Sequence, residues 1–520
     1  MADKIDFFHL RTGRKLSDLP KPPTLEQTVH KRLKGLKSNY PLRSLGVGVD
    51  GELFVSEEER DANFHIIGAP KQGKSKFLEY NIRKDIDMGN GLVLIDPSDF
   101  GATCKAVLDY CAFVGHRKVV IIDPSHQKLA TIQTLNKKAV KQSLNGIMEV
   151  ASILFGAKET ETPRIKRYLA ALIRVITKAG FTLYESRYFS DYHASIDQQL
   201  AILHKVNPAD RDMLTLGTAF KTEHAWENYF GSTINRLDSF WEEPLSLMTG
   251  ADTGIDFVKM IAEGWVILVN LFPDGRHLSE TESQLLGVLI INQIIQAVDT
   301  LKANDWNGVY YMYIDEAGRF ATPQIDTLLS YKRKSGLRVI LAHHYFSQFK
   351  DKQVLQSVKQ NTGIKVMFDV REHEDRMEMI KSLGYGGEIS HAQATYANQD
   401  LPKQYAIIKK GKEPPQRVKI PDVPEVKISQ EQREAYINQL QEQPWYLDRQ
   451  TIEKQIIKRV IINDRTIRED TESPELGKMD DPKTTGEASV SRPIRGELEK
   501  GVRPDNKKSP EPPAKRPIKI

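Results

Sequence analysis

Residues 64–80 read FHIIGAPKQGKSKFLEY, and this stretch indicates both a fold and a class of ligand. The part from Gly68 to Ser75 fits the pattern G-x-x-x-x-G-K-[ST], in which backbone N–H groups of a glycine-rich loop cradle phosphates. An apolar strand, FHII, precedes the loop and a helical pattern begins at Lys74, as the motif requires. The stretch therefore predicts a nucleotide site. It does not say whether a kinase, a switch, a transporter or a motor uses the nucleotide.

We expect the ligand of this loop to be ATP together with Mg²⁺. In the motif the lysine, here Lys74, reaches the β- and γ-phosphates, and the hydroxyl, here Ser75, binds the metal ion. The predicted nucleotide-binding residues are Gly68, Ala69, Pro70, Lys71, Gln72, Gly73, Lys74 and Ser75.

A second element, VYYMYIDEAGRF, is an apolar strand that ends in Asp315 and Glu316. A carboxylate at the end of a buried strand beside such a loop holds the Mg²⁺ water shell, and a second one polarises the attacking water. Acidic residues are also common at ordinary exposed strand ends, but two in a row after an apolar strand favour the catalytic interpretation. We predict Lys74, Asp315 and Glu316 as catalytic residues and Ser75 with Asp315 as the metal site. Glu316 favours hydrolysis over phosphoryl transfer to a small molecule.

The next strand ends in LAHHYFSQF, where polar side chains stand close to the predicted site. In RecA-like motors a polar residue at this point senses the γ-phosphate, so His343, His344 and Gln348 are sensor candidates, with His344 and Gln348 preferred. The alternative is that they are ordinary polar groups of a strand-to-helix turn. A two-histidine metal site is disfavoured because carboxylate or cysteine ligands are missing nearby.

Short apolar strands alternate with helical patterns along much of the chain, which predicts an α/β fold with a parallel sheet and helices on both faces. The strand signal fades between about residues 145 and 244, where charged and aromatic helical patterns indicate an inserted all-helical domain. The last residues are charged, rich in proline and free of aromatic side chains, so we expect disorder. The predicted organisation is a basic arm over 1–41, a RecA-like nucleotide-binding domain over 42–144 and 245–424, the helical insertion over 145–244, a helical segment over 425–464 and a disordered tail over 465–520.

Composition sets broader limits. The net charge of +5 and the pI near 8.7 permit a nucleic-acid partner without requiring one. Cys104 and Cys111 are the only cysteines, which is too few for a disulfide framework, so we expect two buried thiols in a reducing compartment. The N-terminus has no apolar signal segment, and the most apolar runs are shorter than the ~20 residues that cross a bilayer. We expect a cytoplasmic protein with no direct membrane insertion.

Four stretches in succession resemble the motifs of TraG/TraD-type conjugative coupling proteins, within the HerA/FtsK group of DNA-pumping ATPases. They are FHIIGAPKQGKSKFL, GLVLIDPSDF, YIDEAGRFATPQIDTLLSYKRKSGLRVILAHHYFSQF and NTGIKVMFDVREHEDRMEMIKSLG. The resemblance covers about residues 42–420. It implies an ATP-hydrolysing motor that translocates or couples DNA, single- or double-stranded, for type IV secretion. The family acts as a hexameric ring, so we also expect self-association, with a relaxase or secretion-channel proteins as further partners.

The sequence departs from the family at three points. Lys71 and Gln72 replace the usual residues before the second glycine, His344 stands where the family has glutamine, and the two transmembrane helices that open most members are missing. The chain thus resembles a soluble branch without a membrane anchor.

The usual position of the arginine finger, which enters the neighbouring subunit's site, is Asp369 here. Lys365, Arg371 and Arg60 are the remaining finger candidates. The basic helix end with Lys332, Arg333 and Lys334, together with the N-terminal arm, is the expected DNA contact. The alternative function is a HerA-like ATPase switch or assembly subunit of a nuclease or defence complex.

Overall fold

The computed structural model describes most of the chain between residues 42 and 459. The described ranges are 42–48, 51–155, 163–193, 195–231, 234–331, 335–384 and 401–459. The predicted basic arm, the predicted disordered tail and the basic residues Lys332, Arg333 and Lys334 lie outside the described residues.

The described residues form one large sheet of eleven strands. Neighbouring strands are parallel from β10 to β5, and further strands extend the sheet beyond β10 in antiparallel pairings. In spatial order the parallel strands are β10 (Ile364–Met367), β3 (Phe64–Ile67), β9 (Leu337–His343), β8 (Tyr310–Ile314), β4 (Gly91–Asp96), β7 (Val266–Asn270) and β5 (Val119–Ile122). The antiparallel extension is β11 (Tyr405–Lys410), β12 (Gln416–Lys419), β1 (Leu42–Gly48) and β2 (Gly51–Ser56). The predicted α/β class with a mainly parallel sheet is confirmed.

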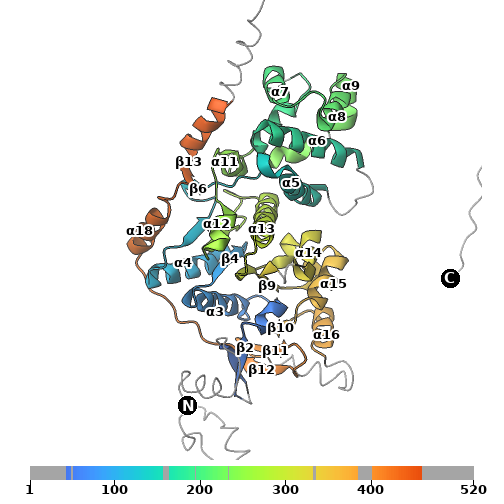
Figure 1. The fold of residues 1–520 in the computed structure, drawn as a ribbon. Helices are drawn as coiled ribbons and strands as arrows, with labels where there is room; N and C mark the ends of the chain where they lie inside the picture. The colour runs from blue at the N-terminus through green and yellow to red at the C-terminus, as the bar shows by residue number, and fades with distance from the viewer. Residues whose placement is uncertain are drawn as a thin grey trace, which may run out of the picture. The chain divides into compact units, whose positions relative to one another are not determined.

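The parallel strands are continuous apolar runs because helices cover both faces of the sheet. In β4, Leu92 and Leu94 belong to the core that also contains the apolar side chains of α3 (Lys74–Asp87) and α4 (Ala102–Val114). The alternating residues Val93 and Ile95 belong to the core of the other face, together with α13 (Glu280–Ala303). Figure 1 shows α3 and α4 side by side, and both contact β4.

Two of these helices bear on expectations from the sequence. The thiols of Cys104 and Cys111 are free and buried in α4, as expected. In the described part of the chain, α13 is the one helix long and apolar enough to cross a membrane, but 72 % of its most apolar window is buried inside the protein. It begins at a capping box formed by Ser279 and Glu282 and serves as a core helix.

Between β5 and β7 the described chain is mostly helical (Figure 1). Its apolar side chains belong to the same core cluster as one face of the sheet, so the helices and the sheet share a continuous core. The longer helices are α5 (Val140–Phe155), α6 (Pro163–Ala179), α7 (Ile196–Leu203), α8 (Arg211–Ala219) and α11 (Leu245–Gly250). The domain division predicted from the sequence remains a prediction.

The remaining elements are short helices next to the strands and a separate two-stranded sheet. In chain order α14 (Pro323–Tyr331) follows β8, α15 (Lys352–Gln360) follows β9 and α16 (His373–Ser382) follows β10, while α12 (Phe257–Ala262) precedes β7. In the C-terminal segment, α18 (Gln430–Leu440) and the helical residues 449–459 are separated by β13 (Tyr446–Asp448). This strand pairs with β6 (Lys128–Ala130), a contact that the sequence pattern did not predict.

A buried charge cluster joins the end of α3 to the sheet. The Asp85 carboxylate in α3 accepts hydrogen bonds from Arg60 Nη1 and Nη2 at 2.8 and 2.9 Å and from Arg43 Nη2 at 2.6 Å. Tyr313 of β8 also donates to Asp85. Burial alone would raise the pKa of Asp85, but the two guanidinium groups outweigh it and hold that pKa well below its usual range. Arg60 is only 1 % exposed, so its assignment as an arginine finger is wrong: its side chain is committed to this cluster.

We predict that Asp85→Asn lowers the free energy of unfolding by about 3–5 kcal/mol, because Arg43 and Arg60 stay buried and keep only Glu57 as a shared carboxylate partner, which leaves one buried positive charge uncompensated. Urea unfolding measures the loss. Asp87→Asn is the matched control, since this neighbouring carboxylate is 39 % exposed and its ion pair with Lys84 contributes at most about 1 kcal/mol. The folded pKa of Asp85 lies below the unfolded value, so its stabilisation is complete above that unfolded pKa and is lost as the pH falls. Equal losses in the two variants would contradict the role of the cluster.

Candidate nucleotide site

The glycine-rich loop is fastened to the neighbouring strands through its backbone. The N–H of Gly68 donates to the carbonyl of His343 in β9 at 3.4 Å, and the N–H of Ala69 donates to Asp369, just beyond β10, at 2.7 Å. On the other side of the loop, Gln72 accepts from the N–H of Gln404 at 2.9 Å. The loop therefore runs from β3 into α3 while three separate segments hold it.

Both motif glycines are required by close contacts or backbone conformation. A Cβ at Gly68 would lie 2.5 Å from the Cβ of Phe368, which is too close for any side chain. Gly73 has a φ of 121°, a conformation that side chains disfavour. The exposed Lys71 also has a positive φ, of 64°, so this departure from the family pattern places an added charge on a strained turn.

Lys74 lies inside the loop with its ammonium group bonded to protein acceptors. Its Nζ donates to the carbonyls of Gly68 at 2.6 Å and Ala69 at 3.2 Å, and it lies 2.6 Å from Nδ1 of His344. Burial lowers the pKa of Lys74 to about 8, against the raising effect of the nearby Asp315 and Glu316 charges. Incoming phosphate oxygens would be stronger acceptors for this ammonium than the two carbonyls.

Asp315 follows β8 and faces two hydroxyl groups. Its Oδ2 accepts from Ser75 Oγ at 3.5 Å and from Ser98 Oγ at 3.4 Å. Burial first, and then the charges of Asp96 and Glu316, raise the pKa of Asp315 to about 6. A buried carboxylate beside hydroxyl oxygens suits a hard cation such as Mg²⁺, which takes few protein ligands and keeps waters and phosphate oxygens. Across the described ranges, no group of three or more His, Cys, Asp and Glu side chains could hold a metal ion.

Asp96 and Ser98 belong to this site, although the sequence analysis assigned them no role. Asp96 ends β4, next to β8, and its Oδ1 accepts from the backbone and hydroxyl of Ser98 at 3.1 and 2.7 Å. Its Oδ2 accepts from the N–H groups of Thr103 and Cys104 at the start of α4. Asp96 therefore positions the Ser98 hydroxyl against Asp315. The available signal was the stretch IDPSDF, a strand that ends in aspartate on the sheet edge shared with Asp315.

Glu316 stands in the left-handed region, with a φ of 50°, and both of its carboxylate oxygens are engaged. Oε1 lies 2.6 Å from Nε2 of His344, and Oε2 accepts from Nε2 of Gln348 at 2.6 Å. Gln348 in turn accepts from the N–H of His344 at 2.7 Å. Burial would raise the pKa of Glu316, but the bonds from His344 and Gln348 lower it below the usual value. The structure thus brings both preferred sensor candidates onto the predicted catalytic carboxylate.

His343, the third sensor candidate, lies away from the site. Its Nε2 is 2.7 Å from Nε2 of His65 in β3, and its Nδ1 is 3.1 Å from the carbonyl of Tyr345. Burial lowers the pKa of His343 to about 3, which keeps the ring neutral. The side chain of His343, the last residue of β9, therefore packs against His65 of the neighbouring strand β3, as the ordinary structural interpretation expects.

The remaining finger candidates differ in accessibility. Lys365 in β10 is half-buried and donates to the backbone carbonyl of Ser382 at 3.3 Å as well as to its hydroxyl. Arg371 is exposed just beyond β10, at the same edge of the sheet as the loop. Of these two, only Arg371 has a side chain free to approach another subunit.

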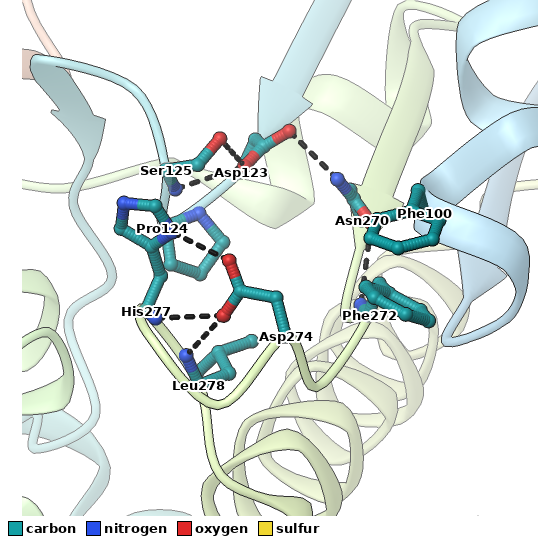
Figure 2. Close-up of a pocket in the computed structure, with 9 residues that line it drawn as sticks. All are labelled: Phe100, Asp123, Pro124, Ser125, Asn270, Phe272, Asp274, His277 and Leu278. Atoms are coloured by element: carbon teal, nitrogen blue, oxygen red, sulfur yellow. Dashed lines mark hydrogen bonds and ion pairs between the residues drawn. The ribbon is translucent and has the colours of Figure 1, made fainter.

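A hollow of about 160 Å³ lies further along the same edge, where β5 and β7 end. Figure 2 shows Asp123 accepting from Asn270 and Ser125, and Asp274 accepting from backbone N–H groups of its own loop. The pair Phe100 and Phe272 closes one side, with ring centroids 4.1 Å apart. Both carboxylates are bonded to the loops that they shape. The residues lining this hollow are Phe100, Asp123, Pro124, Ser125, Asn270, Phe272, Asp274, His277 and Leu278.

A family model matches part of this chain. Residues 256–423 match the family model of the type IV secretion-system coupling protein DNA-binding domain. The matched range contains Asp315 and Glu316 but begins after the glycine-rich loop. No curated protein matches the chain by sequence. The resemblance to coupling proteins is confirmed by the family match.

Solved structures of a coupling protein share the fold. The plasmid coupling protein TrwB in complex with the ATP analogue ADPNP has a TM-score of 0.53 and 16 % identity, and the alignment covers 80 % of this chain and 95 % of that chain. TrwB in complex with ADP and Mg²⁺ has a TM-score of 0.52 and 17 % identity, with 76 % and 94 % covered. The unbound form, TrwBdeltaN70, has a TM-score of 0.52 and 17 % identity, with 77 % and 94 % covered. At these identities the likeness establishes a common fold.

We predict that His344→Ala lowers turnover of a nucleoside triphosphate about 10- to 100-fold, because Glu316 and Lys74 lose the side chain that bonds both. Nucleotide affinity should change only a few-fold, since the loop backbone is untouched. His344→Gln should recover part of the turnover, and His193→Ala, at a side chain that is 67 % exposed in the helical region, is the control. Steady-state turnover and equilibrium binding separate the two effects. Wild-type turnover in His344→Ala would show that the ring does not position Glu316.

Proposed function

We propose that the chain is an ATP-hydrolysing motor that translocates or couples DNA for conjugative transfer through a type IV secretion system. One observation carries the enzymatic part of the proposal: Lys74, Ser75, Asp315 and Glu316 converge at the carboxyl edge of one parallel sheet. The match of residues 256–423 to a coupling-protein DNA-binding domain supports DNA as the polymer.

The phosphate-binding role rests on the loop between β3 and α3. Backbone N–H groups of the loop and the ammonium of Lys74 would bind the β- and γ-phosphates of ATP. Ser75 and Asp315 would hold Mg²⁺, and Ser98 would keep Asp315 oriented through its hydroxyl. When bound, Mg²⁺ supplies neutralisation of the phosphate charge.

The hydrolytic role falls to Glu316. Its lowered pKa keeps the carboxylate charged at neutral pH, as a residue that accepts a hydrogen bond from the attacking water must be. In the structure His344 and Gln348 occupy both oxygens, and His344 also contacts Lys74. A phosphate that draws Lys74 away from His344 would change the hydrogen bonding of that ring and, through it, release Glu316. His344 and Gln348 are thus proposed as the sensor.

The assembly and partners are further parts of the proposal. The resemblance implies a hexameric ring, in which the exposed Arg371 is the finger candidate best placed to reach a neighbouring site. A relaxase and secretion-channel proteins are proposed partners, and a cytoplasmic location goes with them.

The first test separates nucleotide binding from hydrolysis. Lys74→Ala should abolish detectable ATP binding, because it removes the side-chain cation from the phosphate loop. Glu316→Gln should retain ATP binding and lower kcat at least about 100-fold, since the amide cannot accept a proton. Equilibrium binding of a fluorescent ATP analogue and steady-state phosphate release are the two measurements.

Lys76→Ala is the matched control, because this lysine is two residues further along α3 and its side chain is 54 % exposed. It should leave both binding and turnover close to wild type. Equal loss of ATP binding in Lys74→Ala and Glu316→Gln would overturn the role given to Glu316.

The second test concerns DNA. For a translocase, DNA should stimulate ATP turnover and promote ring assembly, and the binding should weaken steeply as salt rises. Replacing Lys332, Arg333 and Lys334 by glutamine should reduce the stimulation more than the basal rate. Turnover with and without DNA, and light scattering of the same samples, provide the measurements. An ATPase rate that no form of DNA changes, in a chain that stays monomeric, would favour the ATP-dependent switch instead.

A further inference from the structure

A second hollow lies beside the helical region, among the segments that follow β6, α6 and α11, and apart from the nucleotide loop. Its volume is about 410 Å³, within the range of small-ligand sites. Its wall comes from residues 133–137 after β6, residues 177–182 at the end of α6, residues 249–252 at the end of α11, and Arg459. We call it the junction hollow.

Two lysines give the junction hollow an uncompensated positive charge. Lys137 is part of its wall, and Nζ of Lys205 lies 4.5 Å above the ring of Phe181, another wall residue. Neither ammonium has an ion-pair partner within the described ranges, and both side chains are exposed. Burial, and then the charge of Lys137, lower the pKa of Lys205, so the two cations are close enough to repel each other. An anion between them would relieve that repulsion.

The other charged groups at the junction hollow are Arg459 and the two carboxylates that it bonds. Arg459 donates from Nε to Glu185 at 2.9 Å and pairs with Asp252 through Nη1. One guanidinium offsets only one of these two carboxylate charges, so Lys137 and Lys205 together leave a single positive charge in excess around the junction hollow. This balance is the reverse of the hollow in Figure 2, where carboxylates prevail.

A polar wall group also lacks a partner. Thr134 is 3 % exposed, and its hydroxyl makes no hydrogen bond with the described residues. A buried hydroxyl left unpaired costs about 1–3 kcal/mol, so an acceptor oxygen brought to this wall would offset a real penalty. Phosphate oxygens are acceptors of this kind, and they also match two ammonium groups.

We propose that the junction hollow is a second DNA contact, which binds a backbone phosphate through Lys137 and Lys205. This inference rests on the proposed function, since it takes the polymer of the motor as the source of the phosphate. Phe181 is only 6 % exposed and lies beneath Lys205, so it offers no face on which a base could stack. The contact is therefore to the backbone and tolerates any sequence.

The test compares two double variants of equal charge change. Lys137→Gln with Lys205→Gln removes the proposed contact. Lys221→Gln with Lys302→Gln removes two exposed lysines that do not line the junction hollow. Fluorescence anisotropy of a labelled oligonucleotide, measured over a series of salt concentrations, gives the affinity and its salt dependence for each protein.

We expect the Lys137/Lys205 variant to bind roughly tenfold more weakly and to lower the slope of log K against log salt by about 1.5 to 2, as loss of two phosphate contacts requires. The control variant should stay near wild type, and basal ATP turnover should stay near wild type in both. Equal weakening in both double variants would show only a loss of general charge and would overturn the site.

Inorganic phosphate, titrated as a competitor at constant ionic strength, distinguishes the sources of the anion. Displacement of the oligonucleotide by millimolar phosphate from wild type, but not from the Lys137/Lys205 variant, is expected if both ligands use the junction hollow. If calorimetry shows that phosphate binds wild type and not the Lys137/Lys205 variant, yet the oligonucleotide affinity of wild type is unchanged by phosphate, the junction hollow is a small-anion site and the DNA assignment fails. A wild-type chain that binds no DNA at all contradicts the motor itself. Wild-type binding with an unchanged Lys137/Lys205 variant contradicts the junction hollow alone.

Discussion

The site depends on the parallel pairing of β3, β9, β8 and β4, because parallel strands deliver their carboxyl ends to one edge of the sheet. The loop of Lys74 follows β3, the sensor candidates follow β9, Asp315 and Glu316 follow β8, and β4 ends in Asp96. These segments are up to about 280 residues apart in the chain, yet the parallel pairing of their strands brings their ends together. Antiparallel pairing of any one of them would send its functional residues to the opposite edge, so the chemistry requires this topology.

Within that frame, hydrogen bonds link Lys74 of the glycine-rich loop to Glu316, the carboxylate proposed for catalysis. His344 contacts Lys74 through one ring nitrogen and Glu316 through the other, and Gln348 holds the second oxygen of Glu316. An ammonium only donates, so a ring that accepts from Lys74 at Nδ1 donates to Glu316 from Nε2. A change at either end therefore alters the bonding at the other. This gives a physical reason for a histidine at position 344, since its two ring nitrogens span both partners.

The sequence was sufficient for the parts of the molecule that are local in the chain. The glycine-rich loop, the apolar strands and the acidic pair Asp315–Glu316 each carry a pattern within a dozen residues, and the sheet follows from their alternation with helices. Contacts between distant segments had no such pattern. The sequence could not show that Asp96 and Ser98 buttress Asp315, or that Arg60 is buried against the end of α3. An arginine can reach a neighbouring subunit only if its side chain is exposed, whereas a buried arginine serves an internal ion pair. Which of the two applies depends on the assembled fold and not on the local sequence.

The two charged clusters at opposite ends of α3 indicate which parts of the site can move. The helix begins at Lys74, in the nucleotide loop, and near its other end Asp85 is bonded to two buried arginines and to Tyr313. Tyr313 lies two residues before Asp315, so the same cluster fixes the strand that carries the acidic pair Asp315–Glu316. Shifting α3 against β8 would separate buried charges at a cost of several kcal/mol. If a bound nucleotide changes the structure, we therefore expect the change in groups that no buried ion pair holds in place. These are the side chains of Glu316, His344 and Gln348.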